Sequence, residues 1–297
     1  MSAVIEFSGV RNRNPHSLPS ALEMGDLANR APSVVATQPA STVSDRYRFI
    51  PTTQVITDLD RAGWKPFAVQ QTNSRKTDGA ATAKHLLRFF NPELYTPDGR
   101  EFVTLNLINS HNAGSSFRFL LGVYRLICAN GLIAGSTYAE HRITHKGYAP
   151  EQVIALTDST SRNAPKLLDF VDQGKQIELS RDEREFFAAA VTRYALPNLD
   201  VDPREVIRPS RREDQEPTLW STTNIVQEKV LQGRVRGWTK PTEERPSPKR
   251  QKARAIRNID RNEKTNSFIM ALADQFRRMK TEPDFAFDAS AFEGVSV

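Results

Sequence analysis

The sequence contains almost no cysteine and no long apolar run. Cys128 is the single cysteine among 297 residues, which excludes a disulfide framework within the chain and favours a reduced, cytoplasmic setting. No stretch approaches the roughly 20 consecutive apolar residues that a membrane span needs. The first residues, MSAVIEFSGVRNRNP, lack the charged start and the apolar centre of a secretion signal. We therefore expect an intracellular protein with no membrane partner.

Motifs for common enzyme chemistry are also missing. The sequence contains no GxxxxGK[ST], GxGxxG, CxxC, HExxH or GxSxG pattern. His141 and His145 lie four residues apart, but no further cluster of metal ligands adjoins them, so no metal site and no cofactor are predicted. Cys128 belongs to an apolar pattern without an identifiable base. We expect a protein that is not an enzyme; an unrecognised reaction using His85, His111, His141 or His145 is the alternative.

Positive charge is concentrated near the C-terminus. The whole chain has a net charge of +6. Between Arg234 and Lys280 there are fourteen Lys and Arg against five Asp and Glu, a net of +9, which leaves −3 for all other residues. A local excess of this kind favours a polyanionic partner such as nucleic acid.

Five basic residues in this region have helical spacing. They follow one another at intervals of four, three, four and three residues, and are Arg250, Arg254, Arg257, Arg261 and Lys264. On one helix they would form a stripe that can follow a phosphate backbone. The alternative is a solvated helix face whose charge is balanced by Asp260 and Glu263.

The stretch from Asn109 to Ser136 has the apolar periodicity of a buried helix, at Phe117, Leu120, Leu121, Tyr124 and Cys128. Arg118 and Arg125 lie seven residues apart in it, and buried guanidinium groups need an anionic partner. That partner is either a carboxylate of the fold or a phosphate. His111 and Asn112 precede the predicted helix, where free amide groups would attract an anion.

The remaining pattern predicts an α+β fold. An antiparallel β-β-β-α unit, covered by the central helix, would include strands at 47–50, 64–70, 84–91 and 101–108 and a short helix ending at Gly63. The expected segments are a disordered N-terminus (1–45), an α+β core (46–196), a Pro- and charge-rich connector (197–217), a helical basic region (218–280) and a flexible acidic-aromatic tail (281–297).

Three stretches carry a resemblance to a known family. They are YRFIPTTQVITDLDRAGW, NSHNAGSSFRFLLGVYRLICANGLIAGS, and LWSTTNIVQEKVLQG with RAIRNIDRNEKTNSFIMALA. They resemble the phage- and plasmid-borne family described as a domain of unknown function and typified by "phage/plasmid-like protein". The resemblance covers residues from about Tyr47 to Met279, and the family label implies no activity. A phage or plasmid origin would place the protein in a bacterial host cell.

A second resemblance suggests a role. The order of the segments around Tyr47, Val55 and Trp64, and of the strands after them, is similar to the Rad-fifty-two-like single-strand annealing proteins. That resemblance implies rings or filaments that hold single-stranded DNA in a basic groove, to which Lys84, Arg88, Arg118 and Arg125 would correspond. The glycine-rich DNA-binding loop of that superfamily is missing here, and the basic helix is not part of its core.

These observations lead to the hypothesis of a single-stranded DNA binding or annealing protein of a phage or plasmid, a homo-oligomer acting in recombination or replication without nucleotide hydrolysis. The expected DNA-binding residues are Lys84, Arg88, His111, Asn112, Arg118, Arg125, Arg250, Arg254, Arg257, Arg261 and Lys264. Two alternatives are a protein-binding counter-defence factor that inhibits a host nuclease and a virion or assembly protein. The C-terminal tail could then bind a host or phage protein.

Overall fold

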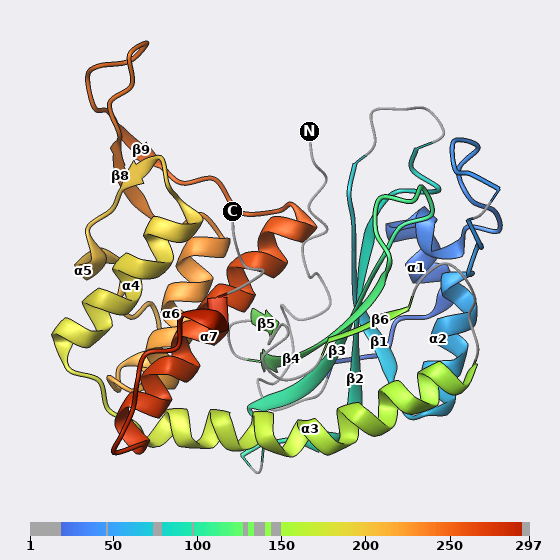
Figure 1. Ribbon diagram of the computed structural model, residues 1–297, viewed down its shortest axis with the longest axis horizontal. Coiled ribbons are helices and arrows are strands. Elements are labelled where there is room, and N and C mark those ends of the chain that lie inside the picture. Colours follow the sequence, from blue (N-terminus) through green and yellow to red (C-terminus); the bar gives the residue numbers. More distant parts are fainter. Residues whose placement is uncertain are drawn as a thin grey trace. The chain divides into compact units, whose positions relative to one another are not determined.

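Two compact units make up the chain, Met1–Leu168 and Asp169–Val297. The computed structural model describes residues 19–45, 47–73, 79–96, 98–126, 130–133, 140–143 and 150–292. The boundary between the units falls inside one long helix. Figure 1 gives the labels of the elements.

An antiparallel sheet forms the first unit. Its strands pair in the order β1-β2-β3-β4-β5, and β6 also pairs with β4. They are β1 (Lys65–Gln71), β2 (His85–Tyr95), β3 (Glu101–Asn109), β4 (Phe117–Arg125), β5 (Asn130–Ile133) and β6 (Glu140–Ile143). Figure 1 shows β1 to β4 side by side. The predicted α+β class and antiparallel sheet are confirmed.

The predicted central helix is wrong, because residues Phe117–Arg125 form strand β4. This strand pairs with β3 along its whole length, from Phe102↔Tyr124 to Ile108↔Arg118. Its side chains are buried on both faces of the sheet except for the half-buried Arg118. A strand buried on both faces needs no alternation of apolar and polar residues, so its apolar run also fits a helical period.

Residues 19–61 hold three short helices. They are α1 (Met24–Arg30), the 3₁₀ helix η1 (Pro32–Val35) and α2 (Thr52–Arg61). Leu27, Ala31 and Val34 are fully buried, so the disorder expected for the first 45 residues does not hold from residue 19 onward. The predicted helix before Gly63 is confirmed, and Gly63 follows it with φ of 85°. The strand predicted at 47–50 is irregular backbone.

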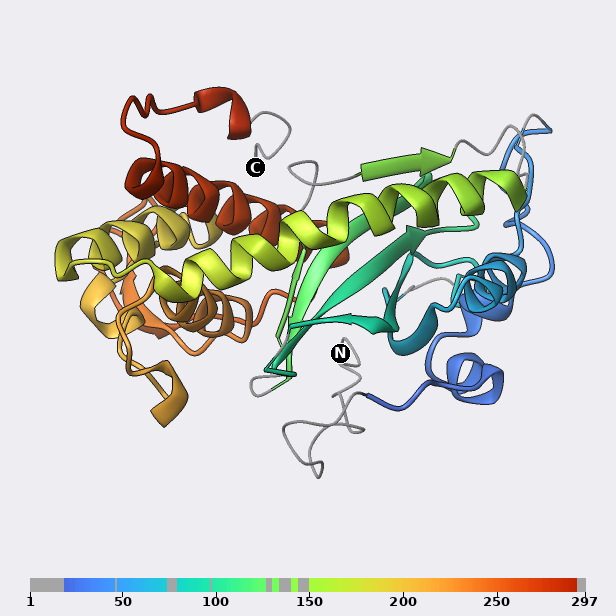
Figure 2. The ribbon, with the colours of Figure 1, turned by 90° about the horizontal axis from the view of Figure 1, so that it is seen from below.

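Helix α3 (Pro150–Gln176) is 27 residues long and belongs to both units. The apolar periodicity of the sequence predicts two shorter helices, at 151–156 and 166–171, whereas Figure 2 shows a single continuous one. Pro165 lies inside it, and Val153, Leu156, Ala164 and Leu167 form its buried stripe. Among the described residues, no helix is long and apolar enough to cross a membrane.

The second unit combines helices with a small sheet. Its elements are α4 (Arg181–Ala195), β7 (Leu199–Asp200), α5 (Pro203–Val206), the 3₁₀ helix η4 (Arg212–Asp214), α6 (Leu219–Leu231), β8 (Arg236–Thr239), β9 (Arg250–Lys252), α7 (Ile259–Thr281) and the 3₁₀ helix η5 (Ala289–Phe292). Helices α4, α6 and α7 pack together, and nearly all of α6 is buried. The apolar periodicity of the sequence predicts helices at 183–194 and 219–231, and α4 and α6 confirm both.

The predicted basic helix from Arg250 is wrong in its first part. Helix α7 begins at Ile259, where the Asn258 side chain accepts a hydrogen bond from the Arg261 amide. Arg250 lies on strand β9, and Arg254 and Arg257 lie in the irregular segment before the helix. The five cations therefore do not share one helix face.

The acidic-aromatic tail packs onto the second unit as far as Phe292. The Phe292 ring lies 5.3 Å from that of Phe268, which stacks on Tyr194 at 4.2 Å. The Asp288 amide donates to Gln275 Oε1 at 3.0 Å. These contacts correct the expectation of a flexible tail for residues 282–292.

Candidate nucleic-acid interface

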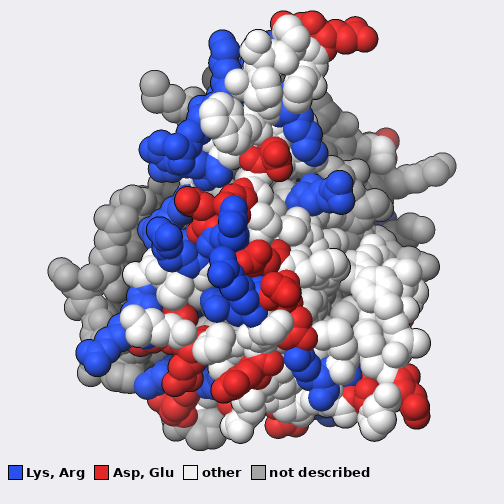
Figure 3. Space-filling view, turned by 90° about the vertical axis from the view of Figure 1, so that its left-hand side faces the viewer, with Lys and Arg blue, Asp and Glu red and all other residues white. Residues whose placement is uncertain are grey.

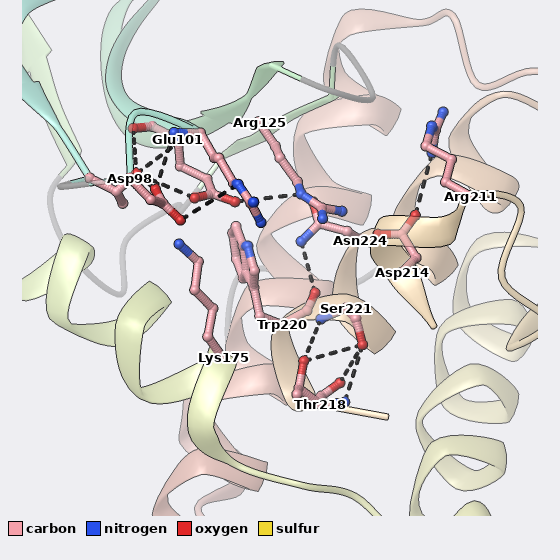
Figure 4. A network of polar contacts seen from close by, with 12 residues as sticks. Asp98, Glu101, Arg125, Lys175, Arg211, Asp214, Thr218, Trp220, Ser221 and Asn224 are labelled. Carbon is pink, nitrogen blue, oxygen red and sulfur yellow. Dashed lines mark hydrogen bonds and ion pairs between the residues drawn. The ribbon is translucent and has the colours of Figure 1, made fainter. Parts of the chain in front are cut away.

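Arg125, a predicted phosphate ligand, is bound inside the fold. Its Nε atom lies 3.4 Å from Oε1 of Glu101, and their side chains are 7% and 1% exposed. Figure 4 shows the two groups directed toward each other. A guanidinium paired with a buried carboxylate is part of the fold, so we remove Arg125 from the candidate interface.

The other predicted groove residues do not line a continuous trough with Arg125. Arg88 and Arg118 lie on the same face of the sheet, because Arg88 is opposite Asn106, which is opposite Leu120. Arg125 lies an odd number of residues after Arg118 on the same strand, so its side chain is on the other face. Arg88 is buried, at 8% exposure. Lys84 comes just before β2 and is half-buried, with its carbonyl accepting from the Thr72 amide at 2.8 Å.

His111 belongs to a buried polar cluster of the first unit. The Thr52 hydroxyl lies 3.2 Å from Nε2 of His111 and 3.1 Å from Nε2 of His85, and Ser33 Oγ lies 2.9 Å from Nδ1 of His85. All four residues are 0% exposed. Burial, with a smaller contribution from the charge of His111, lowers the pKa of His85 to about 3, so this imidazole stays neutral. The network stabilises the fold and has no exposed surface for a ligand.

Asn112 is exposed and has a local role. Its Oδ1 accepts a hydrogen bond from the Gly114 amide at 3.0 Å, next to Ala113 with φ of 59°. The loop leads into strand β4 and not into a helix, so the expected helix dipole is absent there. Neither His111 nor Asn112 forms the anticipated anion site.

The strongest candidate lies on the hairpin of β8 and β9. Arg236 is opposite Lys252, and Trp238 is opposite Arg250, so all four side chains project from the same face. All four are exposed, and Trp238 shows 54% of its surface. We call these four residues the hairpin face. Gly237 points to the opposite side, where an added Cβ would lie 2.4 Å from the Asp200 carbonyl oxygen.

Cations on and near the hairpin have no carboxylate partner within the described part of the chain. This holds for Arg236, Lys240, Arg245, Lys249, Arg250, Lys252 and Arg254. Figure 3 shows Lys and Arg on both flanks of the projecting hairpin and acidic side chains at its tip, and acidic and basic groups alternate below it. Like charges directly opposite each other, as in Arg236 and Lys252, destabilise a strand pair, so an anion bound between them would relieve the repulsion.

A pocket of about 350 Å³ adjoins the hairpin face. Its lining residues are Glu205, Val206, Arg234, Val235, Arg236 and Lys252. Arg234 is held by Glu228, at 2.5 Å, and Lys229 Nζ donates to the Glu205 carbonyl oxygen at 2.7 Å. Arg236 and Lys252 belong to both the pocket and the hairpin face, so the two form one continuous surface.

Of the five cations that the sequence predicted on one helix, only the first two lie on or near the hairpin. Arg250 is on the hairpin face and Arg254 is exposed two residues after β9. Arg257, Arg261 and Lys264 are exposed farther along the chain, and Arg261 Nη2 donates to the Ala195 carbonyl oxygen at 2.6 Å. The sequence analysis missed Arg236, Trp238 and Lys252. The alternation in RVRGWTK, followed by a Pro-rich turn and KRQK, was the signal that could have identified them.

A metal centre finds no support in the part of the chain that the structure describes, where no three His, Cys, Asp or Glu side chains form a ligand group. Cys128, His145 and the side chain of His141 lie outside the described residues. They therefore stay untested as ligands or catalytic groups.

Comparison with known proteins gives relatives and a family. UPF0380 protein YafZ of Escherichia coli (strain K12) is 29% identical over 261 residues, which cover 84% of this chain and 89% of that protein. UPF0380 protein YfjQ of the same organism is 29% identical over 251 residues, with the same coverage. No solved structure matches. Residues 39–267 match the family described as "Domain of unknown function (DUF932)", and the chain belongs to that family.

Proposed function

We propose that the protein binds single-stranded nucleic acid through the hairpin face and takes part in strand annealing without nucleotide hydrolysis. One observation carries the proposal: an exposed tryptophan lies among three exposed cations, Arg236, Arg250 and Lys252. None of the three has an ion pair in the described structure. Cations neutralise the phosphates of a strand, and an aromatic ring stacks on any base, which is the chemistry of binding that tolerates many sequences.

The spacing of the hairpin face suits an unpaired strand. Arg236 and Trp238 are two residues apart on β8, which is about 7 Å along a strand. A base stacked on Trp238 would therefore place its flanking phosphates near Arg236 on one side and near Arg250 across the hairpin. In a duplex the faces of the bases are covered by their neighbours, so the contribution of the tryptophan is lost. We expect a preference for single strands.

Annealing adds one requirement, that the bases remain able to pair. A single exposed ring on a two-stranded hairpin contacts one base and leaves its neighbours in solvent. Base pairing is then downhill and needs no nucleotide cofactor. A homo-oligomer would present several hairpin faces to one strand, and each additional subunit would raise the effective concentration of the next contact.

The experiment is a titration of fluorescently labelled single- and double-stranded oligonucleotides at several salt concentrations. The triple variant Arg236→Ala/Arg250→Ala/Lys252→Ala removes the cations of the hairpin face. We expect the slope of log affinity against log salt to become shallower by about 2, because each lost phosphate contact on a single strand contributes about 0.7. Trp238→Ala should weaken single-strand binding by roughly 5- to 150-fold, from about 1–3 kcal/mol of stacking.

A matched control removes the same charge elsewhere. Arg61, Arg100 and Arg181 are exposed, and each lies within 4 Å of a carboxylate, at 3.2, 3.9 and 2.7 Å. Their triple alanine variant should retain the salt slope of the original protein. If the hairpin and control variants bind equally, the hairpin face is not the interface. Mass photometry with and without the oligonucleotide reports whether copies of the chain assemble on it.

A further inference from the structure

Arg88 is a buried cation that the fold does not neutralise. It lies in strand β2 with 8% of its surface exposed, and its Nη1 atom has no hydrogen-bond partner and no contact with solvent. Across the described ranges, no hydrogen bond or ion pair involves its side chain. Burial lowers the pKa of Arg88, because desolvation disfavours the charged guanidinium, and an electrostatic interaction with Tyr124 offsets part of this effect.

Arg88 has an apolar neighbour on one side, the buried Ala68 opposite it on β1, and a polar neighbour on the other. Asn106 is directly opposite it on β3, and the Oδ1 atom of Asn106 is buried without a donor. The Asn106 amide nitrogen donates to the Leu120 carbonyl oxygen at 3.0 Å and to Thr104 Oγ1 at 3.2 Å. Thr104 lies on the same face and accepts that bond, which leaves its hydroxyl proton able to donate to another group. One face of the sheet therefore combines donors with a buried acceptor.

Two glycines make room for these side chains. A Cβ on Gly131 would lie 1.7 Å from Nη1 of Arg88, and a Cβ on Gly122 would lie 2.9 Å from both the Asn106 amide nitrogen and Thr104 Oγ1. Arg88 is on β2 and Gly131 is on β5, with two strands between them in the pairing order. The sheet must curve strongly for a side chain to reach that far, since neighbouring strands are about 4.8 Å apart. The guanidinium thus lies across the concave face.

An unpaired buried guanidinium is costly, and proteins usually place a carboxylate beside it. Arg125, on the opposite face of the same sheet, has Glu101 for this purpose. No such carboxylate pairs with Arg88 in the described structure, although its fork of donors suits an oxyanion. The buried Oδ1 atom of Asn106 is an acceptor, so its partner must supply a hydrogen-bond donor.

We propose that the concave face of the sheet is a binding site for a small oxyanion that also carries a hydroxyl group, such as hydrogen phosphate. Arg88 would donate to its anionic oxygens, and Asn106 Oδ1 would accept from its hydroxyl. This site lies in the first unit and does not depend on the nucleic-acid binding proposed for the hairpin face.

The test is thermal unfolding of the full chain at constant ionic strength, with inorganic phosphate replacing chloride. The original protein should show a saturable rise in Tm. Arg88→Met should abolish this rise and, in chloride alone, should have a Tm equal to or above that of the original protein, because the unpaired charge is gone. Arg100→Met, which removes an exposed cation of the same unit, should keep the phosphate response.

Several results would overturn the proposal. They are the lack of a saturable response in the original protein, or the same response in Arg88→Met. If Arg88→Met does not fold, Arg88→Lys keeps the charge without the fork, and isothermal titration with phosphate should show at least tenfold weaker binding; equal affinity would refute the site. Sulfate has the shape of phosphate without its proton at neutral pH, and binding as tight as that of phosphate would exclude Asn106 as the acceptor.

The same assay distinguishes free phosphate from a phosphate group of a nucleic-acid strand. In Trp238→Ala, inorganic phosphate should still raise Tm, since the two sites are independent. If phosphate has no effect and the response to a single-stranded oligonucleotide requires Arg88, the concave face contacts the strand itself and the small-anion site is refuted.

Discussion

The ion pair between Arg125 and Glu101 gives the most direct test of how the first unit is stabilised. Arg125 is the last residue of strand β4 and Glu101 is the first residue of β3, and the two are directly opposite each other. Their side chains are 7% and 1% exposed, and the Nε to Oε1 distance is 3.4 Å. Replacing Arg125 by Met keeps most of the packing and removes the positive charge beside the buried carboxylate of Glu101, whose Oε2 still accepts a hydrogen bond from Thr96 Oγ1 at 3.4 Å.

The expected cost follows from that burial. Breaking a buried pair by removing one member costs about 3–5 kcal/mol, because the remaining charge is desolvated and uncompensated. For a protein of this size each kcal/mol lowers Tm by roughly 2–4 °C, so Arg125→Met should lower it by about 6–20 °C. The double variant Arg125→Met/Glu101→Leu should recover most of this loss, since two apolar groups can replace a buried pair at little cost.

Urea unfolding of the single and double variants measures these differences. A loss below about 1 kcal/mol for Arg125→Met, or a double variant less stable than the single one, would refute the assigned role of this pair.

Two further predictions concern buried groups of the first unit. Burial lowers the pKa of His85 from 6.5 to about 3, so below pH 6.5 the unfolded state binds a proton that the folded state does not. The free energy of unfolding should therefore fall by up to about 1.4 kcal/mol for each pH unit below 6.5. Urea midpoints should change less between pH 7 and 5 in His85→Gln than in the original protein, and an equal change in both would contradict this. Gly131→Ala should destabilise by about 1–3 kcal/mol through its collision with Arg88 Nη1, and Arg88→Ala should remove most of that penalty; purely additive effects in a double-mutant cycle would show that the two residues do not interact.

Local patterns predicted the strands and helices that are flanked by clear turns. The alternation of Val103, Leu105 and Leu107 identified β3, and the turn around Gly99 separated it from β2. The two residues between them on the other face, Thr104 and Asn106, were expected to be exposed but are fully buried. Alternation reports which residues are polar, and the covering of the second face depends on the rest of the fold.

Strand β4 shows why the central helix was mispredicted. Its sequence FRFLLGVYR is apolar at almost every position, so helical and strand periods both fit it. The aromatic residues and Val123 favour a strand, whereas Gly122 is unfavourable in the interior of a strand and of a helix alike. The pairing of β4 with β3 on one side and with β5 and β6 on the other decides the matter, and such pairing is not visible in a local window.

The prediction of a basic helix from Arg250 was wrong for a different reason. Spacings of four and three residues are meaningful only if the whole segment is helical, and the cap at Asn258 shows that the helix begins after Arg257. Once β8 and β9 pair, a period of two replaces the period of 3.6, and Trp238 joins Arg250 on one face. The local charge excess follows from the composition alone, whereas the set of residues that share a surface depends on the pairing of β8 with β9.

Carboxylates divide the arginines of this chain into classes with different roles. Arg125 and Arg234 each contact a nearly buried glutamate, Glu101 and Glu228, and such cations cannot add a phosphate without giving up that partner. The cations of the hairpin face carry no such cost, so their binding energy is available to a ligand. Arg88 forms a third class, buried and unpartnered within the described structure, where binding an anion and stabilising the fold are the same event. Salt should therefore weaken strand binding at the hairpin, whereas phosphate at fixed ionic strength should stabilise the first unit.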